Sequence, residues 1–181
     1  KKIGSSLKIL YEEVIKMAHC RKTQLSIFLT YRCNLKCIYC YVGEKKQYRT
    51  TIDYQFVQRA ILDFFQKYSS REIRFFATGE PTLEFDLMKK IRGWAYEQTG
   101  DDCRFELQTN GFFSTKIAEW VSKNIDIVWV SCDGPPEVQN YYLPTPAGRP
   151  SSDIVEKNIR YLATEPVVLG CRATIGARNV K

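Results

Sequence analysis

Histidine is almost missing from this sequence, with His19 the only one among 181 residues. Hydrolytic triads and most general-base mechanisms use an imidazole, so the sequence disfavours that class of enzyme. Long apolar runs are also missing, since a stretch such as residues 125–132 is far shorter than the ~20 residues that cross a bilayer. The first residues lack the apolar centre of a secretory signal. We therefore expect a cytoplasmic protein with no membrane partner.

Charge is not concentrated in one part of the chain. The net charge is +7, but the lysines and arginines are scattered in short pairs along the sequence. Nucleic-acid binding needs a focused basic patch, so we expect a solvated basic surface and no nucleic-acid partner. A positively charged site for small acidic molecules stays open.

Cysteine is the residue type that the sequence does have in unusual number. There are seven cysteines, an odd count, and no secretory signal accompanies them. A disulfide framework is typical of small secreted proteins, whereas clustered thiols in a reducing compartment favour a metal site.

Apolar, β-rich runs alternate with segments of helical periodicity. The runs cover residues 25–30, 72–77, 104–109, 125–131 and 167–174, and amphipathic stretches lie between them. We expect an α/β fold with a parallel sheet that curls into an open or closed barrel. Thr51 or Asp53 is expected to cap the first of these helices, a further helix is expected near residues 5–18, and residues 140–152 are expected to form a surface loop.

Three closely spaced cysteines carry the clearest chemical signal. Cys33, Cys37 and Cys40 fall within eight residues, and thiolates favour zinc or an iron–sulfur cluster over magnesium or calcium. Structural zinc usually takes four ligands, and no fourth cysteine lies close to these three; His19 and Cys20, across an expected strand, would be awkward but not impossible partners. A four-iron cluster held by three cysteines keeps one iron open for a chelating ligand.

The Cys-x3-Cys-x2-Cys pattern, with Tyr39 before its last cysteine, resembles the signature of radical S-adenosylmethionine (radical SAM) enzymes. Four further segments at strand ends agree: residues 77–83 (ATGEPTL), 107–111 (LQTNG), 130–136 (VSCDGPP) and 170–175 (GCRATI). The last two are most similar to the SPASM-type branch that matures peptides and sulfatases. The resemblance covers roughly residues 25–181.

The resemblance implies a TIM-like partial (β/α)6 barrel with about five of its six strands present. It implies a C-terminally incomplete core domain over residues 25–181, after an N-terminal helical extension over residues 1–24. A [4Fe-4S] cluster would cleave S-adenosylmethionine reductively, and the resulting 5′-deoxyadenosyl radical would abstract hydrogen from a peptide or protein side chain. A flavodoxin- or ferredoxin-type protein would donate the electron. A small-molecule substrate and a non-enzymatic zinc- or cluster-binding module are the alternatives.

The resemblance also assigns roles to single residues near the cluster. Cys33, Cys37 and Cys40 would ligate iron, and Tyr39 would lie near the adenine, with plain packing as its alternative. Glu80 would face the methionine ammonium group, and its alternative is a turn residue ahead of Pro81.

Further roles fall at the ends of the later strands. Gly79 would allow close backbone approach, and Ser131 would meet the ribose or carboxylate of the cofactor. Arg172 would pair with that carboxylate or with a surface acid. Asp133 would be a catalytic, substrate-side base or a polar neighbour, and an Asp-Gly-Pro turn is its alternative.

The sequence departs from the family pattern in two places. Thr78 stands where the family more often has glycine, and Gln139, Asn140 and Leu143 replace the His-Asp pair and the arginine of the maturase branch. These changes weaken the assignment to the sulfatase-maturing subgroup and leave the cluster motif intact. Cys132 and Cys171 are expected to pack as small apolar residues.

Overall fold

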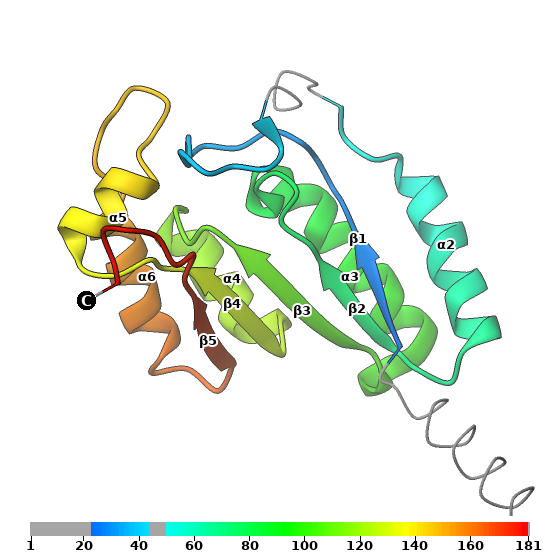
Figure 1. Cartoon of the computed structure of the whole chain (residues 1–181). Coiled ribbons are helices and arrows are strands. Elements are labelled where there is room, and N and C mark those ends of the chain that lie inside the picture. The colour runs from blue at the N-terminus through cyan, green and yellow to red at the C-terminus, as the bar shows by residue number, and fades with distance from the viewer. Residues whose placement is uncertain (1–22, 44–49, 181) are drawn as a thin grey trace, which may run out of the picture.

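A computed structural model describes residues 23–43 and 50–180, and Figure 1 shows a parallel sheet with helices packed against it. The expected helix over residues 5–18 lies outside the described residues. The strands are β1 (Gln24–Ile27), β2 (Glu72–Phe75), β3 (Arg104–Thr109), β4 (Ile127–Ser131) and β5 (Val168–Arg172).

The strands neighbour one another in chain order, β1-β2-β3-β4-β5, and every pairing is parallel. Each crossover therefore advances by one strand in the same direction, which is the arrangement of a barrel wall and not of a doubly wound sheet. The expected α/β fold with a partial barrel is confirmed. Within the described residues β5 is an edge strand, and no sixth strand pairs with it.

Four of the five helices in the described residues follow the strands as the apolar periodicity predicts, and the helix over residues 136–142 was not predicted. They are α2 (Tyr54–Lys67), α3 (Phe85–Thr99), α4 (Thr115–Asn124), α5 (Pro136–Tyr142) and α6 (Ser152–Leu162), with short 3₁₀ turns η2 (Pro81–Glu84) and η3 (Gly100–Asp102). Asp53, one of the two expected caps, accepts a hydrogen bond of 2.8 Å from the backbone N–H of Phe56 at the start of α2.

The core lies between the sheet and the apolar stripes of these helices. Phe75, Phe105 and Leu107 on the central strands are almost completely buried, as are Ile61 of α2 and Met88 of α3. Burial of this apolar surface contributes most of the driving force for folding. The rigid sheet then presents the loops at its carboxyl edge in fixed positions.

Two expectations about local structure are wrong in whole or in part. The expected loop over residues 140–152 is present over residues 143–151, because α5 runs from Pro136 to Tyr142, burying Val138 and Tyr142, and α6 begins at Ser152. Cys171 does not pack as a small apolar residue: its side chain is exposed, while Cys132 is half-buried.

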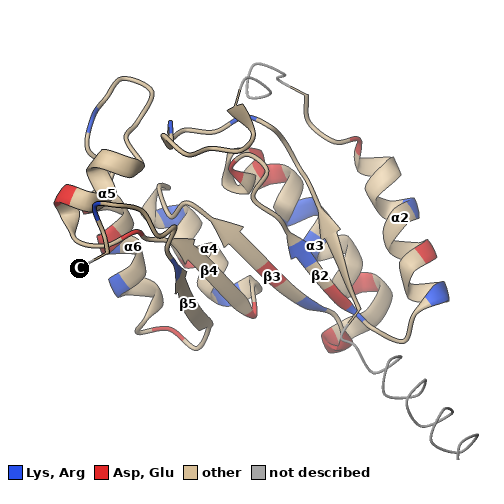
Figure 2. Ribbon diagram, viewed as in Figure 1, with Lys and Arg blue, Asp and Glu red and all other residues tan. Residues whose placement is uncertain are grey.

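Basic and acidic segments are interspersed over the helices, and both signs also occur on β2 and β3 (Figure 2). No helix among residues 23–43 and 50–180 is long and apolar enough to cross a bilayer.

Candidate functional site

A cavity of about 410 Å³ opens at the carboxyl ends of the strands. Eight of the nine predicted site residues line it: Cys33, Cys37, Tyr39, Cys40, Gly79, Glu80, Ser131 and Arg172. Asp133 is the exception. The structure therefore brings together residues that are up to 139 positions apart in sequence, from Cys33 to Arg172, at the edge where parallel α/β folds bind their ligands.

The cysteine loop, residues 31–43, leaves β1 and reaches toward α5, as Figure 1 shows. Its backbone is docked there: the N–H of Lys36 donates to the carbonyl of Pro144 at 2.7 Å, and that of Ile38 to Tyr142 at 3.0 Å. Leu35 is 1% exposed and packs in a small apolar cluster with α5. The helix that the sequence did not predict is thus the platform on which the cysteine loop rests.

The donor set in this cavity suits an iron–sulfur cluster. Cys33, Cys37 and Cys40 form no disulfide, and no three His, Cys, Asp or Glu side chains of the described residues are grouped closely enough to hold one metal ion. In a four-iron cluster each thiolate binds a different iron, so the sulfurs stand further apart than around one zinc ion. The Asn110 amide also donates to the sulfur of Cys33 at 3.6 Å, a contact that favours thiolate.

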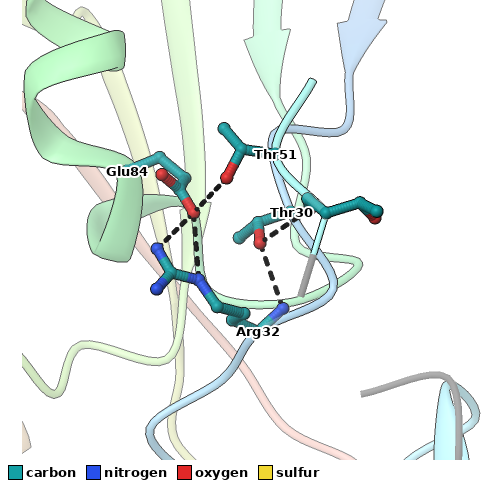
Figure 3. A network of polar contacts seen from close by, with 5 residues as sticks. Thr30, Arg32, Thr51 and Glu84 are labelled. Carbon is teal, nitrogen blue, oxygen red and sulfur yellow. Dashed lines mark hydrogen bonds and ion pairs between the residues drawn. The ribbon is translucent and has the colours of Figure 1, made fainter. Parts of the chain in front are cut away.

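The start of the cysteine loop is tied to the neighbouring strand end by a polar network (Figure 3). The Glu84 carboxylate oxygen Oε1 accepts from Arg32 Nη2 at 2.5 Å and from the Thr51 hydroxyl at 2.9 Å. Thr30 accepts from the Arg32 backbone N–H at 3.2 Å. Arg32 precedes the first cysteine, so this network fixes the chain on one side of the cavity.

The turn after β2 lies directly against the cysteine loop. A Cβ atom at Gly79 would stand 2.3 Å from the carbonyl oxygen of Arg32, so only glycine fits there. The neighbouring Glu80 N–H donates to that same carbonyl at 2.8 Å. The predicted close backbone approach at Gly79 is thus present, although its partner in the structure is the cysteine loop.

Glu80 is 1% exposed, and its carboxylate accepts four hydrogen bonds inside the protein. The donors are the Thr82 N–H and hydroxyl at 3.1 and 2.7 Å, the Thr109 hydroxyl at 2.7 Å and the Asn110 N–H at 2.8 Å. Burial raises the pKa of Glu80, and these four donors oppose that rise. The carboxylate links the end of β2 to the end of β3.

Polar residues of the neighbouring strands hold Arg172 in the cavity. Its Nη1 donates to the Gln108 oxygen at 2.8 Å, and the Gln108 amide nitrogen donates to Glu106 at 3.2 Å. Glu106 also pairs with Arg74 at 2.7 Å and accepts from Gln24 at 3.0 Å. Burial alone would raise the pKa of Glu106, but the bonds from Arg74, Gln24 and Gln108 hold it below its ordinary value.

Asp133 lies behind the cavity wall and not in it. The residue is 3% exposed, and its two carboxylate oxygens accept from the Tyr39 hydroxyl at 2.6 Å and from the Thr174 N–H at 2.9 Å. Burial, followed by this bond to Asp133, raises the pKa of Tyr39. Asp133 is not among the residues that line the cavity.

Comparison with known families decides the class of this fold and site. The model of the radical SAM superfamily matches residues 27–168. The chain belongs to the radical SAM superfamily. The cofactors of this superfamily are a [4Fe-4S] cluster and S-adenosylmethionine, and both suit the three cysteines and the adjoining cavity.

Individual relatives include enzymes of different kinds. The chain is 27% identical over 161 residues to a serine-type anaerobic sulfatase-maturating enzyme of Bacteroides thetaiotaomicron, covering 82% of the chain and 38% of that protein. It is 35% identical over 115 residues to a GTP 3′,8-cyclase of Corynebacterium glutamicum, covering 60% of the chain and 30% of that protein.

A solved structure shares the fold of the chain. The structure titled native anSMEcpe with bound AdoMet and Cp18Cys peptide matches with a TM-score of 0.68 and 25% identity, over 83% of this chain and 42% of that one. The chain spans 54% or less of the length of its matched curated relatives.

Proposed function

We propose that this chain is the cluster- and cofactor-binding part of an enzyme that modifies a peptide or protein side chain by radical chemistry. The observation that carries the proposal is one cavity lined by Cys33, Cys37 and Cys40 at the carboxyl edge of a parallel sheet. When bound there, the cluster and S-adenosylmethionine supply an electron and a carbon radical that removes a hydrogen atom from the substrate.

The residues of the chain divide the binding between them. The three cysteines hold the cluster, and the Asn110 amide supports the charge on the sulfur of Cys33. Arg172, with one N–H committed to Gln108, keeps its remaining donors for the cofactor carboxylate. Ser131 lies opposite Arg172 in the β4–β5 register, so both reach the same end of the cavity.

Tyr39 and the turn at Gly79 and Glu80 complete the proposed cofactor site. Tyr39 would contribute its half-exposed ring near the adenine, with its hydroxyl turned away toward Asp133. The cavity volume of about 410 Å³ falls within the range of sites for one cofactor-sized ligand. We propose that Glu80 acts on the methionine end of the cofactor mainly by fixing the backbone of this turn.

The peptide substrate is supported by the likeness to the sulfatase-maturating enzyme and to the solved structure that carries a peptide. The likeness to a GTP 3′,8-cyclase favours the second candidate, a small-molecule substrate. A flavodoxin- or ferredoxin-type electron donor and a cytoplasmic location complete the proposal, because a low-potential cluster needs a reduced partner.

The test is metal and cofactor analysis of the full-length protein, purified without oxygen. We expect about four irons per chain at the three cysteines, loss of that iron after Cys33, Cys37 and Cys40 are all changed to alanine, and release of 5′-deoxyadenosine on reduction. Zinc without iron would contradict the proposal. Stimulation of 5′-deoxyadenosine release by a peptide fraction, and not by a low-mass metabolite fraction, separates the two substrate classes.

A further inference from the structure

One carboxylate joins the cysteine loop to the ends of two strands. Tyr39 stands between Cys37 and Cys40, and its hydroxyl donates to Asp133 Oδ2 at 2.6 Å across 94 positions of sequence. The other oxygen of Asp133 accepts from the backbone N–H of Thr174, just beyond β5, at 2.9 Å. Both acceptor atoms of this side chain are therefore committed within the protein.

The backbone of Asp133 is held as firmly as its side chain. Its N–H donates at 2.9 Å to the side-chain oxygen of Gln139, a residue of α5 that is 2% exposed. Its carbonyl accepts from the Asn179 side chain at 2.9 Å. Gln139 occupies one of the positions at which this sequence departs from the maturase pattern, and the structure gives it a role in holding Asp133.

The part of the loop that carries Tyr39 is held by short turns and by contacts with its neighbours, among which is the charged Asp133 carboxylate. Ile38 and Tyr39 are 56% and 38% exposed, and a turn follows in which the Cys40 N–H donates to the Cys37 carbonyl at 3.2 Å. On this side it is held by the backbone bond from Ile38 to Tyr142 and by the Tyr39 ring, whose centroid lies 5.8 Å from that of Tyr142. A strong hydrogen bond to a buried carboxylate adds the directional contact that packing lacks.

We propose that Asp133 is a positioning residue, whose carboxylate holds Tyr39 and so keeps Cys37 and Cys40 in place for the cluster. This rests on the proposed function in so far as these cysteines bind iron. It differs from the role of substrate-side base that the family resemblance suggested, because a base must reach the substrate and Asp133 is not part of the cavity lining.

Hydrogen exchange of the cysteine loop tests the proposal in the full-length protein under anaerobic conditions. Tyr39→Phe removes the hydroxyl and keeps the ring, and Asp133→Asn removes the charge and keeps the size. Exchange in the peptide over residues 36–43 should become roughly tenfold faster or more in each, because a hydrogen bond to a charged group is worth at least that factor. Tyr141→Phe, on an exposed ring of the adjoining helix, is the matched control and should leave exchange unchanged.

The double variant Tyr39→Phe with Asp133→Asn should exchange no faster than the faster single variant, since both changes break the same bond. Iron release to a chelator should be faster in both single variants than in the wild type, and no faster in the double variant than in the faster single variant. Unchanged loop exchange in both single variants, or fully additive effects in the double variant, would overturn the proposal. If the wild type holds no iron and both single variants still exchange faster than it, the positioning role of Asp133 stands and the proposed function is refuted.

Discussion

Glu80 has two proposed roles: direct contact with the methionine ammonium group, and fixing of the turn through its buried hydrogen bonds. Replacement of Glu80 by alanine separates these roles. Its carboxylate accepts from the backbone N–H groups of Thr82 and Asn110 and from the hydroxyls of Thr82 and Thr109. The hydroxyls can rotate toward other acceptors, but the two backbone N–H groups cannot. Glu80→Ala should therefore destabilise the protein and disturb the turns around the cavity.

The expected loss of stability follows from the two backbone N–H groups that are left without an acceptor. Each buried N–H left without an acceptor costs about 1–3 kcal/mol, so Glu80→Ala should lower the free energy of unfolding by roughly 2–6 kcal/mol. Water entering the space left by the side chain would keep the loss near the lower figure. For a domain of this size, the melting temperature should fall by roughly 5–20 °C.

Thermal unfolding of the full-length protein, followed by circular dichroism beside a titration with S-adenosylmethionine, measures both effects. Glu119→Ala, which removes an exposed carboxylate from α4, is the matched control and should melt within about 1 °C of the wild type. If Glu80→Ala melts like the wild type and loses S-adenosylmethionine affinity by about tenfold or more, the carboxylate contacts the cofactor directly and the reasoning from its buried hydrogen bonds is refuted.

Three further substitutions test the cavity. Gly79→Ala should lower the iron content, because its Cβ would stand 2.3 Å from the Arg32 carbonyl oxygen. Gly93→Ala is the control, since its Cβ would have nothing within 4 Å, and it should stabilise α3 by up to ~1 kcal/mol. Equal iron content in the two variants would contradict the close approach at Gly79. Arg172→Lys should weaken S-adenosylmethionine binding about tenfold with iron unchanged, and unchanged affinity by titration would remove the guanidinium from the site. Gly170→Ala should displace the Trp129 ring, 2.3 Å from the added carbon, and an unaltered tryptophan emission spectrum would count against that contact.

The fold follows from features that are local in the sequence. The run over Arg104–Thr109 forms β3 with the bounds that its apolar composition predicts, and the strand order follows from repeated strand–helix crossovers. The cysteine spacing likewise predicts a metal site, because the three cysteines lie within one loop. Polar residues at strand ends are brought together by topology alone, and eight predicted site residues share one cavity for that reason.

Contacts between distant residues could not be predicted in the same way. The bond between Tyr39 and Asp133 and the pair of Arg74 and Glu106 depend on register and loop geometry, which composition does not encode. Helix α5 has only seven residues and begins at Pro136, directly after Pro135, so its apolar period is too short to be recognised. Cys171 was misjudged because strand alternation indicates which face a side chain takes and not whether that face is covered.

Electron paramagnetic resonance of the reduced full-length protein, with S-adenosylmethionine labelled with ¹⁵N at its amino group, tests the central claim most directly. Three cysteines in one cavity leave one iron of a four-iron cluster for that amino group, so we predict hyperfine coupling between the label and the cluster in the wild type. The coupling should disappear when Cys33, Cys37 and Cys40 are all replaced by alanine. A reduced cluster whose spectrum does not respond to the labelled cofactor would contradict the assignment of this cavity.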